Sequence, residues 1–241
     1  MKDDLQSGVV SSRKENFFDF FPSPRRVQVF ITMDVYKCVG MPWKVLSLNR
    51  LGHDPDRVHE GVSVRADDTN LFEYPFIYMS GDQEFPPLSE KEISNLKLYL
   101  EFGGTLLIDD SIGKTDFRFD KSVRREVKRL FPDKSLEKMP IDHTVFKSFY
   151  LLNQAYGRIM EKSYLEGVTL ENRTVIIYSQ NDLGGAWSKN PLGSWEYEVI
   201  PGGETQRAMA FRLGINIVMY ALTGNYKQDQ VHLPLILKRQ M

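Results

Sequence analysis

The fold is decided by residues 103–111, which read Gly-Gly-Thr-Leu-Leu-Ile-Asp-Asp-Ser. The uninterrupted run of apolar and β-branched residues at 105–108 is typical of a short strand that is buried on both faces of a sheet. Two glycines precede this strand and two carboxylates follow it. In an open α/β sheet the carboxyl ends of the strands border the crevice where ligands bind. We therefore expect Asp109, Asp110 and Ser111 to lie where such a fold places its chemistry.

The composition of the 241 residues is that of an ordinary globular domain, with 41% hydrophobic and 26% charged residues. The single Cys38 excludes an internal disulfide framework. There are 31 Lys and Arg residues against 32 Asp and Glu residues, so no basic excess favours nucleic acid or an anionic membrane. No apolar run reaches the length of a membrane span, and the N-terminus lacks the apolar core of a signal peptide, so we expect a cytoplasmic protein.

Strand and helix patterns alternate on both sides of the central strand. Ser89 begins a predicted helix, because Glu92 three residues later completes a capping box and Gly103 ends the pattern. A basic amphipathic helix is predicted over 120–131, and we interpret its four basic residues as a solvent-exposed face. The remaining predicted strands cover 27–33, 62–64, 76–79, 135–139 and a hairpin of 165–170 and 173–178; the remaining helices cover 43–51 and 204–222, with a stop at 223–224.

This order of elements predicts a three-layer α/β fold, in which helices cover both faces of a mainly parallel central sheet. We interpret residues 1–25 as an N-terminal tail or arm and residues 26–241 as one domain, because no repeat, low-complexity tract or linker divides the chain. A glycine-rich loop is expected between the hairpin and the last helix, and the apolar tail after residue 224 is expected to pack as an edge strand or arm.

Paired carboxylates at a strand end indicate a candidate metal site. The candidate ligands are Asp109, Asp110, Asp142 and His143, with Asp182 at the end of a later strand. Carboxylates suit Mg²⁺, Mn²⁺ or Ca²⁺, and a histidine admits Zn²⁺. No known ligand spacing such as His-Glu-x-x-His occurs, so a structural role is favoured, in which one aspartate caps a turn and the other pairs with an arginine. No cofactor is expected; a divalent metal is the alternative.

Asp109, Asp110 and His143 are also the candidate catalytic residues. A Ser-His-Asp set can be drawn from Ser111, His143 and Asp110, but Gly-x-Ser-x-Gly is absent and Cys38 lies in an early loop. The candidate ligand-binding residues follow the predicted strand ends: Ser80, Gly81, Ser111, Asn181, Asp182 and Trp187. Trp187 and Trp195 are expected either to line a pocket or to anchor their loop.

Several stretches together resemble a known bacterial family, the domain of unknown function 4159. They comprise 71–79, the helix-Gly-Gly-strand unit that ends at 109–110, 123–132, 142–143, 178–183, 211–216 and 230–238. The resemblance covers nearly the whole chain from about Val27 onward.

The resemblance implies a flavodoxin-like fold related to class I glutamine amidotransferases and to trehalose-utilisation-type proteins. Those amidotransferases carry a nucleophilic cysteine after the Gly-Gly strand, where this chain has Asp109 and Asp110. The implied function is therefore a non-catalytic binding or assembly module, with a MoxR-type ATPase or a von Willebrand factor A-type protein as partner. Many family members carry export or membrane segments, whereas the composition and hydropathy of this chain predict no nucleic-acid partner and no membrane span. The alternative is a hydrolase, with or without a metal, that uses Asp109, Asp110 and His143.

Overall fold

The computed structural model describes residues 28–29, 62–190 and 192–239. The predicted N-terminal tail, the helix over 43–51 and most of the strand over 27–33 lie outside the described residues. The described part of that predicted strand is β1 (Gln28–Val29), which pairs antiparallel with β2 (Val62–Ser63). Two short 3₁₀ helices, η1 (Thr69–Glu73) and η2 (Thr144–Phe146), lie in the connections.

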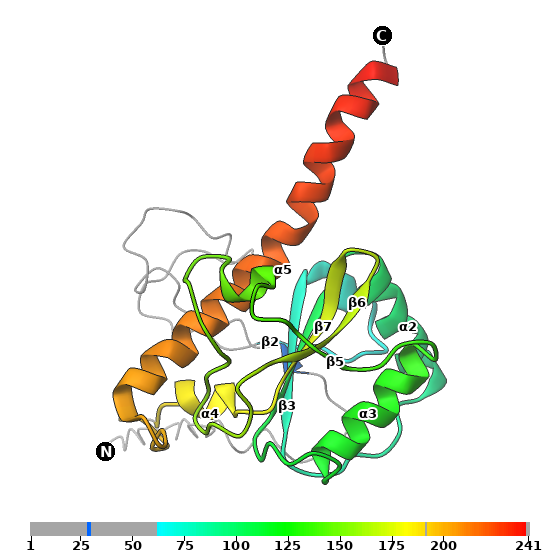
Figure 1. Cartoon of the computed structure of the whole chain (residues 1–241). Coiled ribbons are helices and arrows are strands. Elements are labelled where there is room, and N and C mark those ends of the chain that lie inside the picture. Colours follow the sequence, from blue (N-terminus) through cyan, green and yellow to red (C-terminus); the bar gives the residue numbers. More distant parts are fainter. Residues whose placement is uncertain (1–27, 30–61, 191, 240–241) are drawn as a thin grey trace, which may run out of the picture.

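The centre of the molecule is a five-stranded sheet with the order β3-β4-β7-β6-β5 (Figure 1). The strands are β3 (Phe76–Gly81), β4 (Thr105–Asp110), β5 (Glu137–Lys138), β6 (Glu166–Leu170) and β7 (Arg173–Ser179). β3, β4 and β7 run parallel, whereas β6 is antiparallel to β7 and β5 is antiparallel to β6. The sheet is thus mixed, and the predicted central strand and hairpin are confirmed.

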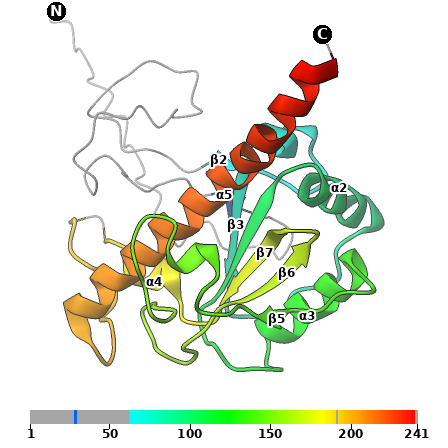
Figure 2. The same cartoon turned by 45° about the horizontal axis from the view of Figure 1, so that its top comes forward.

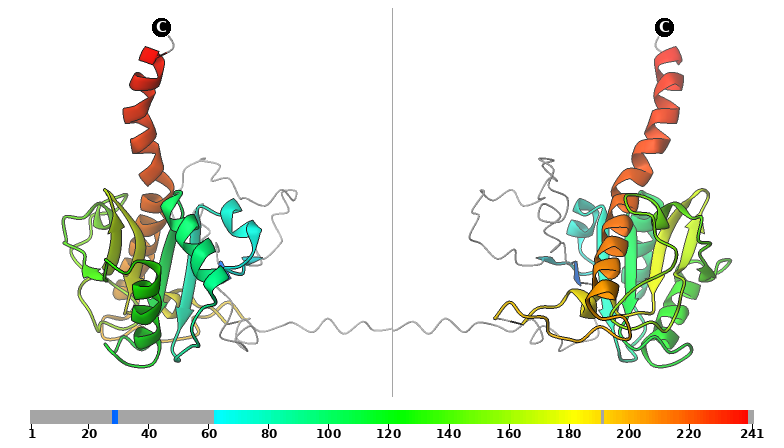
Figure 3. Two further views of the ribbon diagram at one scale, coloured as in Figure 1. Left: turned by 90° about the vertical axis from the view of Figure 1, so that its right-hand side faces the viewer. Right: turned by 60° about the vertical axis from the view of Figure 1, so that its left-hand side comes forward.

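Helices cover both faces of this sheet (Figures 2 and 3). α2 (Glu90–Glu101) and α3 (Phe119–Leu130) pack on one face, and α4 (Leu183–Trp187) and α5 (Gly203–Arg239) pack on the other. The capping box of α2 is confirmed, because the Ser89 hydroxyl accepts from the Glu92 amide at 3.3 Å and the Glu92 carboxylate accepts from the Ser89 amide at 2.7 Å.

Two predictions about the C-terminal third are wrong. The loop expected after β7 contains a helix, α4, whose first two amides donate to the carboxylate of Asp109 in β4. The helix α5 does not stop at residue 224 but continues to Arg239, so the tail is not an edge strand. A helix-interior glycine costs only about 1 kcal/mol relative to alanine, and it therefore does not by itself end a helix. No helix in the described ranges is both long and apolar enough to cross a bilayer.

Side chains alternate along β4 between the two helical layers. Leu106 and Ile108 belong to the core under α2 and α3, whereas Leu107 belongs to the core under α4 and α5. Because successive strand residues point to opposite faces, the two carboxylates that end β4 are separated by the sheet. Asp109 faces the α4 side and Asp110 faces the α3 side.

Candidate functional site

Asp109 is fully buried at the end of β4 and accepts three hydrogen bonds. Its Oδ1 accepts from the Leu183 amide at 2.9 Å, and its Oδ2 accepts from the Gly184 amide at 2.8 Å. The Tyr78 hydroxyl donates to Oδ2 at 2.9 Å. The first amides of α4 lack partners within their own helix, so a carboxylate from β4 satisfies them. Asp109 therefore joins three elements that are not consecutive in the sequence: β3, β4 and α4.

A second carboxylate, Asp182, lies beside this group. Asp182 adopts a left-handed backbone conformation, with φ 54°, at the N-cap of α4, and it accepts from the Gly185 amide at 3.0 Å. Arg158 forms an ion pair with its Oδ2. Burial and the negative charge of Asp182 raise the pKa of Asp109 to about 7, against the opposing effect of the Gly184 and Leu183 amides.

Asp110 points to the opposite face of the sheet. Its Oδ1 accepts from the Ile112 amide at 2.8 Å, which closes the turn after β4. The Tyr178 hydroxyl lies 3.3 Å from Asp110 Oδ2 and 3.1 Å from Asp120 Oδ1, so one hydroxyl links both carboxylates. Burial raises the pKa of Asp110. The turn-capping half of the favoured structural interpretation is confirmed for Asp110. The other half is wrong, because Asp109 accepts from Tyr78 and two amides rather than pairing with an arginine.

Three of the four basic residues of α3, its arginines, are held in ion pairs, which corrects their interpretation as a solvent-exposed face; the fourth, Lys128, is exposed as predicted. Arg124 pairs with buried Asp120 at 2.9 Å and with Glu166 of β6 at 2.8 Å. Arg125 and Arg129 both pair with buried Glu126, each at 2.6 Å. These arginines are only about a third exposed or less, and they connect α3 to its neighbours.

Asn181 is also buried and fully engaged. Its side-chain oxygen accepts from the Lys162 amide at 2.8 Å, and its side-chain nitrogen donates to the Lys162 carbonyl at 2.6 Å. This paired contact fixes the loop after η2 against the end of β7. Asn181 therefore has no polar atom left that points to an open space.

His143 lies at the other end of the sheet, so the expectation that it joins Asp109 and Asp110 is wrong. Its Nε2 is 3.1 Å from the Oγ1 of Thr174, at the start of β7, and its Nδ1 accepts from the Val145 amide at 3.1 Å. Asp109 pairs in register with Ser179, five residues further along β7. At about 3.3 Å per residue, this separation is about 16 Å. The distance arises because the loop that carries His143 enters from the amino edge of the sheet.

The candidate metal ligands therefore do not form one site. Asp109 and Asp110 occupy opposite faces, and exposed Asp142 lies beside the distant His143. Within the ranges that the structure describes, no three His, Cys, Asp or Glu side chains are placed to hold a metal ion. The Ser-His-Asp set of Ser111, His143 and Asp110 is separated in the same way.

The remaining predicted ligand-binding residues do gather at the carboxyl edge. Ser80 pairs in register with Asp109, and the Ser111 amide donates to the Gly81 carbonyl at 3.1 Å. Trp187 ends α4, its ring centroid lies 6.2 Å from that of Phe211, and its buried indole N–H meets no acceptor among the described residues. Parallel strands deliver Ser80, Gly81, Ser111, Asn181 and Asp182 to this edge, as the sequence predicts.

An open depression lies beside this edge rather than over the carboxylates. It has a volume of about 460 Å³ and lies where the loop after α4 meets the start of α5; its lining comprises 195–199, Pro201, Gly203, Glu204 and Arg207. The sequence predicts that Trp195 either lines a pocket or anchors its loop, and Trp195 is part of this lining. The depression as a whole carries no motif, because it depends on how the loop folds back on α5.

The fold and this edge define a mixed α/β domain whose strand-end carboxylates are buried and bound internally. The chain belongs to the family described as Domain of unknown function (DUF4159), whose model matches residues 53–222. The family membership expected from the sequence is thereby confirmed. A comparison with curated proteins found no match.

Proposed function

We propose that this domain is a non-catalytic, amidotransferase-like binding or assembly module. One observation carries the proposal: the residues that end β4, where the resemblance would place a nucleophile, are buried carboxylates whose oxygens accept hydrogen bonds from the protein itself. A nucleophile or general base needs an open side and a hydrogen-bond partner on the substrate. Asp109 and Asp110 instead bind groups of the protein itself and so hold neighbouring segments together.

The resemblance suggests the class of partner. A MoxR-type ATPase or a von Willebrand factor A-type protein is the proposed companion, and the interaction is expected to use a surface other than the buried carboxyl edge. Purified domain and purified ATPase, mixed at micromolar concentrations, are expected to form a complex that calorimetry detects.

A thermal-stability experiment tests the non-catalytic role. The wild type, Asp109→Asn and Asp110→Asn are heated with Mg²⁺, Mn²⁺, Zn²⁺ or a chelator. A metal that binds only the native state raises the melting temperature by mass action. We expect no metal-dependent shift in the wild type and a lower melting temperature in both variants. A shift in the wild type that both variants lose would overturn the proposal in favour of the metal-dependent hydrolase.

A direct assay covers the chemistry of the related amidotransferases. The wild-type domain is incubated with glutamine and ammonia release is measured. The proposal expects no release above that of a heat-denatured sample, because a carboxylate held by backbone amides cannot replace a thiolate as nucleophile. Release that disappears in Asp109→Asn, with the fold retained, would contradict it.

A further inference from the structure

Large apolar side chains are concentrated on the loop that joins α4 to α5. Leu192 is 91% exposed, Ile200 53%, Trp195 37% and Tyr197 36%, all within nine residues. Single exposed apolar residues are common on protein surfaces, but a concentration of them marks a contact surface. Tryptophan and tyrosine are also the residues that most often anchor protein interfaces.

The depression beside these residues is held in shape by a buried arginine. Arg207 is 3% exposed and donates to the carbonyls of Ala186 at 2.6 Å and Tyr197 at 2.7 Å. Its guanidinium lies 4.4 Å from the ring centroid of Trp195. The same arginine thus fixes α4, the loop and the wall of the depression, so little conformational entropy is left to lose when a ligand enters.

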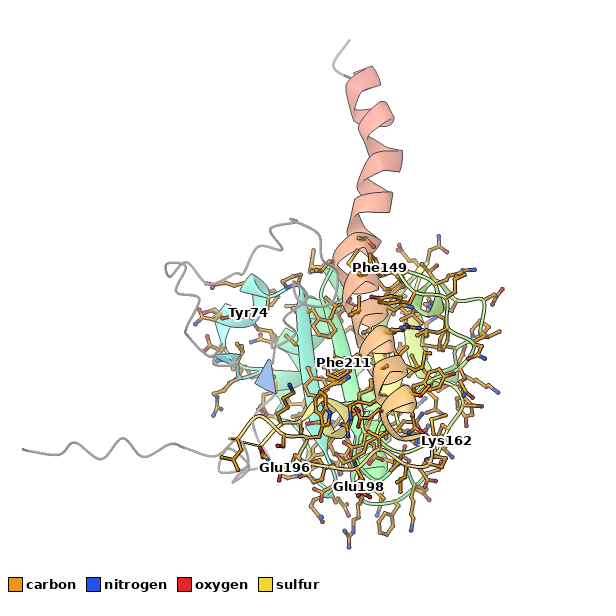
Figure 4. The ribbon with its side chains drawn as sticks, turned by 90° about the vertical axis from the view of Figure 1, so that its left-hand side faces the viewer. Tyr74, Phe149, Lys162, Glu196, Glu198 and Phe211 are labelled. Carbon is orange, nitrogen blue, oxygen red and sulfur yellow. The ribbon has the colours of Figure 1, made fainter. Side chains whose placement is uncertain are left out.

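The charge of the lining determines which charge a ligand should carry. Three carboxylates, Glu196, Glu198 and Glu204, surround the depression, against the single guanidinium of Arg207. Arg207 already pairs with Glu204 at 2.9 Å. Glu196 and Glu198 are exposed, and no ion pair with either of them occurs within the described part of the chain (Figure 4).

Two further cations border the lining, and neither pairs with Glu196 or Glu198. Arg158 pairs with Asp182 and lies 5.5 Å from the ring centroid of Tyr197, and Lys189 lies 4.6 Å from that of Trp195. The lining therefore keeps two unpaired carboxylates beside an indole. A polyanion would meet like charge here, whereas a cationic side chain with an alkyl stem matches both the charge and the apolar wall.

We propose that this depression receives a lysine or arginine side chain from a basic, apolar segment of a protein partner. The flanking apolar residues of that segment pack on Leu192, Trp195 and Ile200. This inference rests on the proposed binding role and specifies the chemistry of the partner. It does not depend on which protein supplies the segment.

A peptide-binding experiment tests this proposal. The probe is a fluorescein-labelled hexapeptide, Leu-Lys-Leu-Arg-Leu-Lys, and its control replaces each cation by glutamine. Fluorescence anisotropy is measured with the wild type, with Glu196→Gln/Glu198→Gln, and with Glu73→Gln/Glu84→Gln. The last variant changes the net charge equally at exposed glutamates outside the depression.

We expect the wild type to bind the cationic probe and not the glutamine control. The variant in the depression should bind about tenfold more weakly, and the charge-matched variant within about twofold of the wild type. No binding by the wild type at millimolar peptide, equal weakening in both variants, or equal competition by spermine would each overturn the proposal. The metal and glutamine assays test the non-catalytic role alone, whereas the peptide assay tests the binding of a basic segment. Failure of one proposal can therefore be distinguished from failure of the other.

Discussion

At the scale of single residues, Asp109 is the position on which the carboxyl edge depends. Its oxygens accept from two amides of α4 and from Tyr78. Asp109→Asn turns one oxygen into an NH₂ group that faces N–H donors, which leaves a buried donor without an acceptor. We expect this variant to lower the free energy of unfolding by about 2 to 4 kcal/mol, measured by urea titration. Asp142→Asn, at an exposed position, should change it little.

The raised pKa of Asp109 makes stability depend on pH. The folded state holds a proton up to about pH 7, whereas an unfolded aspartate releases it near pH 4, so the folded state binds more protons between these values. This contribution to the free energy of unfolding therefore decreases as pH rises from about 4 to 7, by an amount on the order of a few kcal/mol.

The difference between wild type and Asp109→Asn isolates that contribution. Burial lowers the pKa of His143, which stabilises the fold at higher pH and gives the opposite slope near pH 6. Because both proteins contain His143, its slope cancels in the difference. Urea titrations at several pH values between 4 and 8 measure this difference in the free energy of unfolding. A difference that does not change with pH across this range would refute the raised pKa of Asp109.

At the scale of elements, the short helix α4 needs a glycine at its second position. A Cβ on Gly184 would collide with the Tyr78 hydroxyl, which is buried and bonded to Asp109. Gly184→Ala should destabilise the domain by about 1 to 3 kcal/mol, although alanine is the better helix former. In a Tyr78→Phe background the collision is absent, so the same substitution should cost much less. Equal costs in both backgrounds would show that the close contact is irrelevant.

Removal of the N-cap of α2 is expected to destabilise the domain less than the change in α4. Ser89 caps this helix through the reciprocal contact with Glu92. Ser89→Ala removes the acceptor for the Glu92 amide and should lower the free energy of unfolding by about 1 kcal/mol. Thermal or urea unfolding measures the change, with Thr115→Ala, at an exposed position, as control.

At the scale of the whole molecule, the C-terminal part of α5 projects away from the sheet and its helices (Figures 1 and 3). The part of α5 that packs on the sheet includes buried Ala210, Leu213 and Ile217. A chain that ends at Thr223 should therefore keep its free energy of unfolding within about 0.5 kcal/mol. A chain that ends at Met209 should not fold, since it lacks these core residues. Loss of folding in the longer chain would show that the projecting part contributes to the core.

The sequence alone determined the α/β class, the buried central strand, the cap of α2, the β6–β7 hairpin and the family. Each of these depends on neighbours in the chain: apolar periodicity, a serine three residues before a glutamate, or turn residues between two strands. Parallel strands also placed Ser80, Asp109 and Asn181 at one edge without any further information.

Only the tertiary structure decided what that edge does. Asp109 and Asp110 are adjacent in sequence, yet the alternation of a strand sends them to opposite faces, and the loop that carries His143 enters at the other end of the sheet. Whether a carboxylate is open to a ligand or bound to amides depends on α4, which lies more than seventy residues away. Burial and hydrogen bonding are properties of the packed chain, and no local pattern in the sequence contains them.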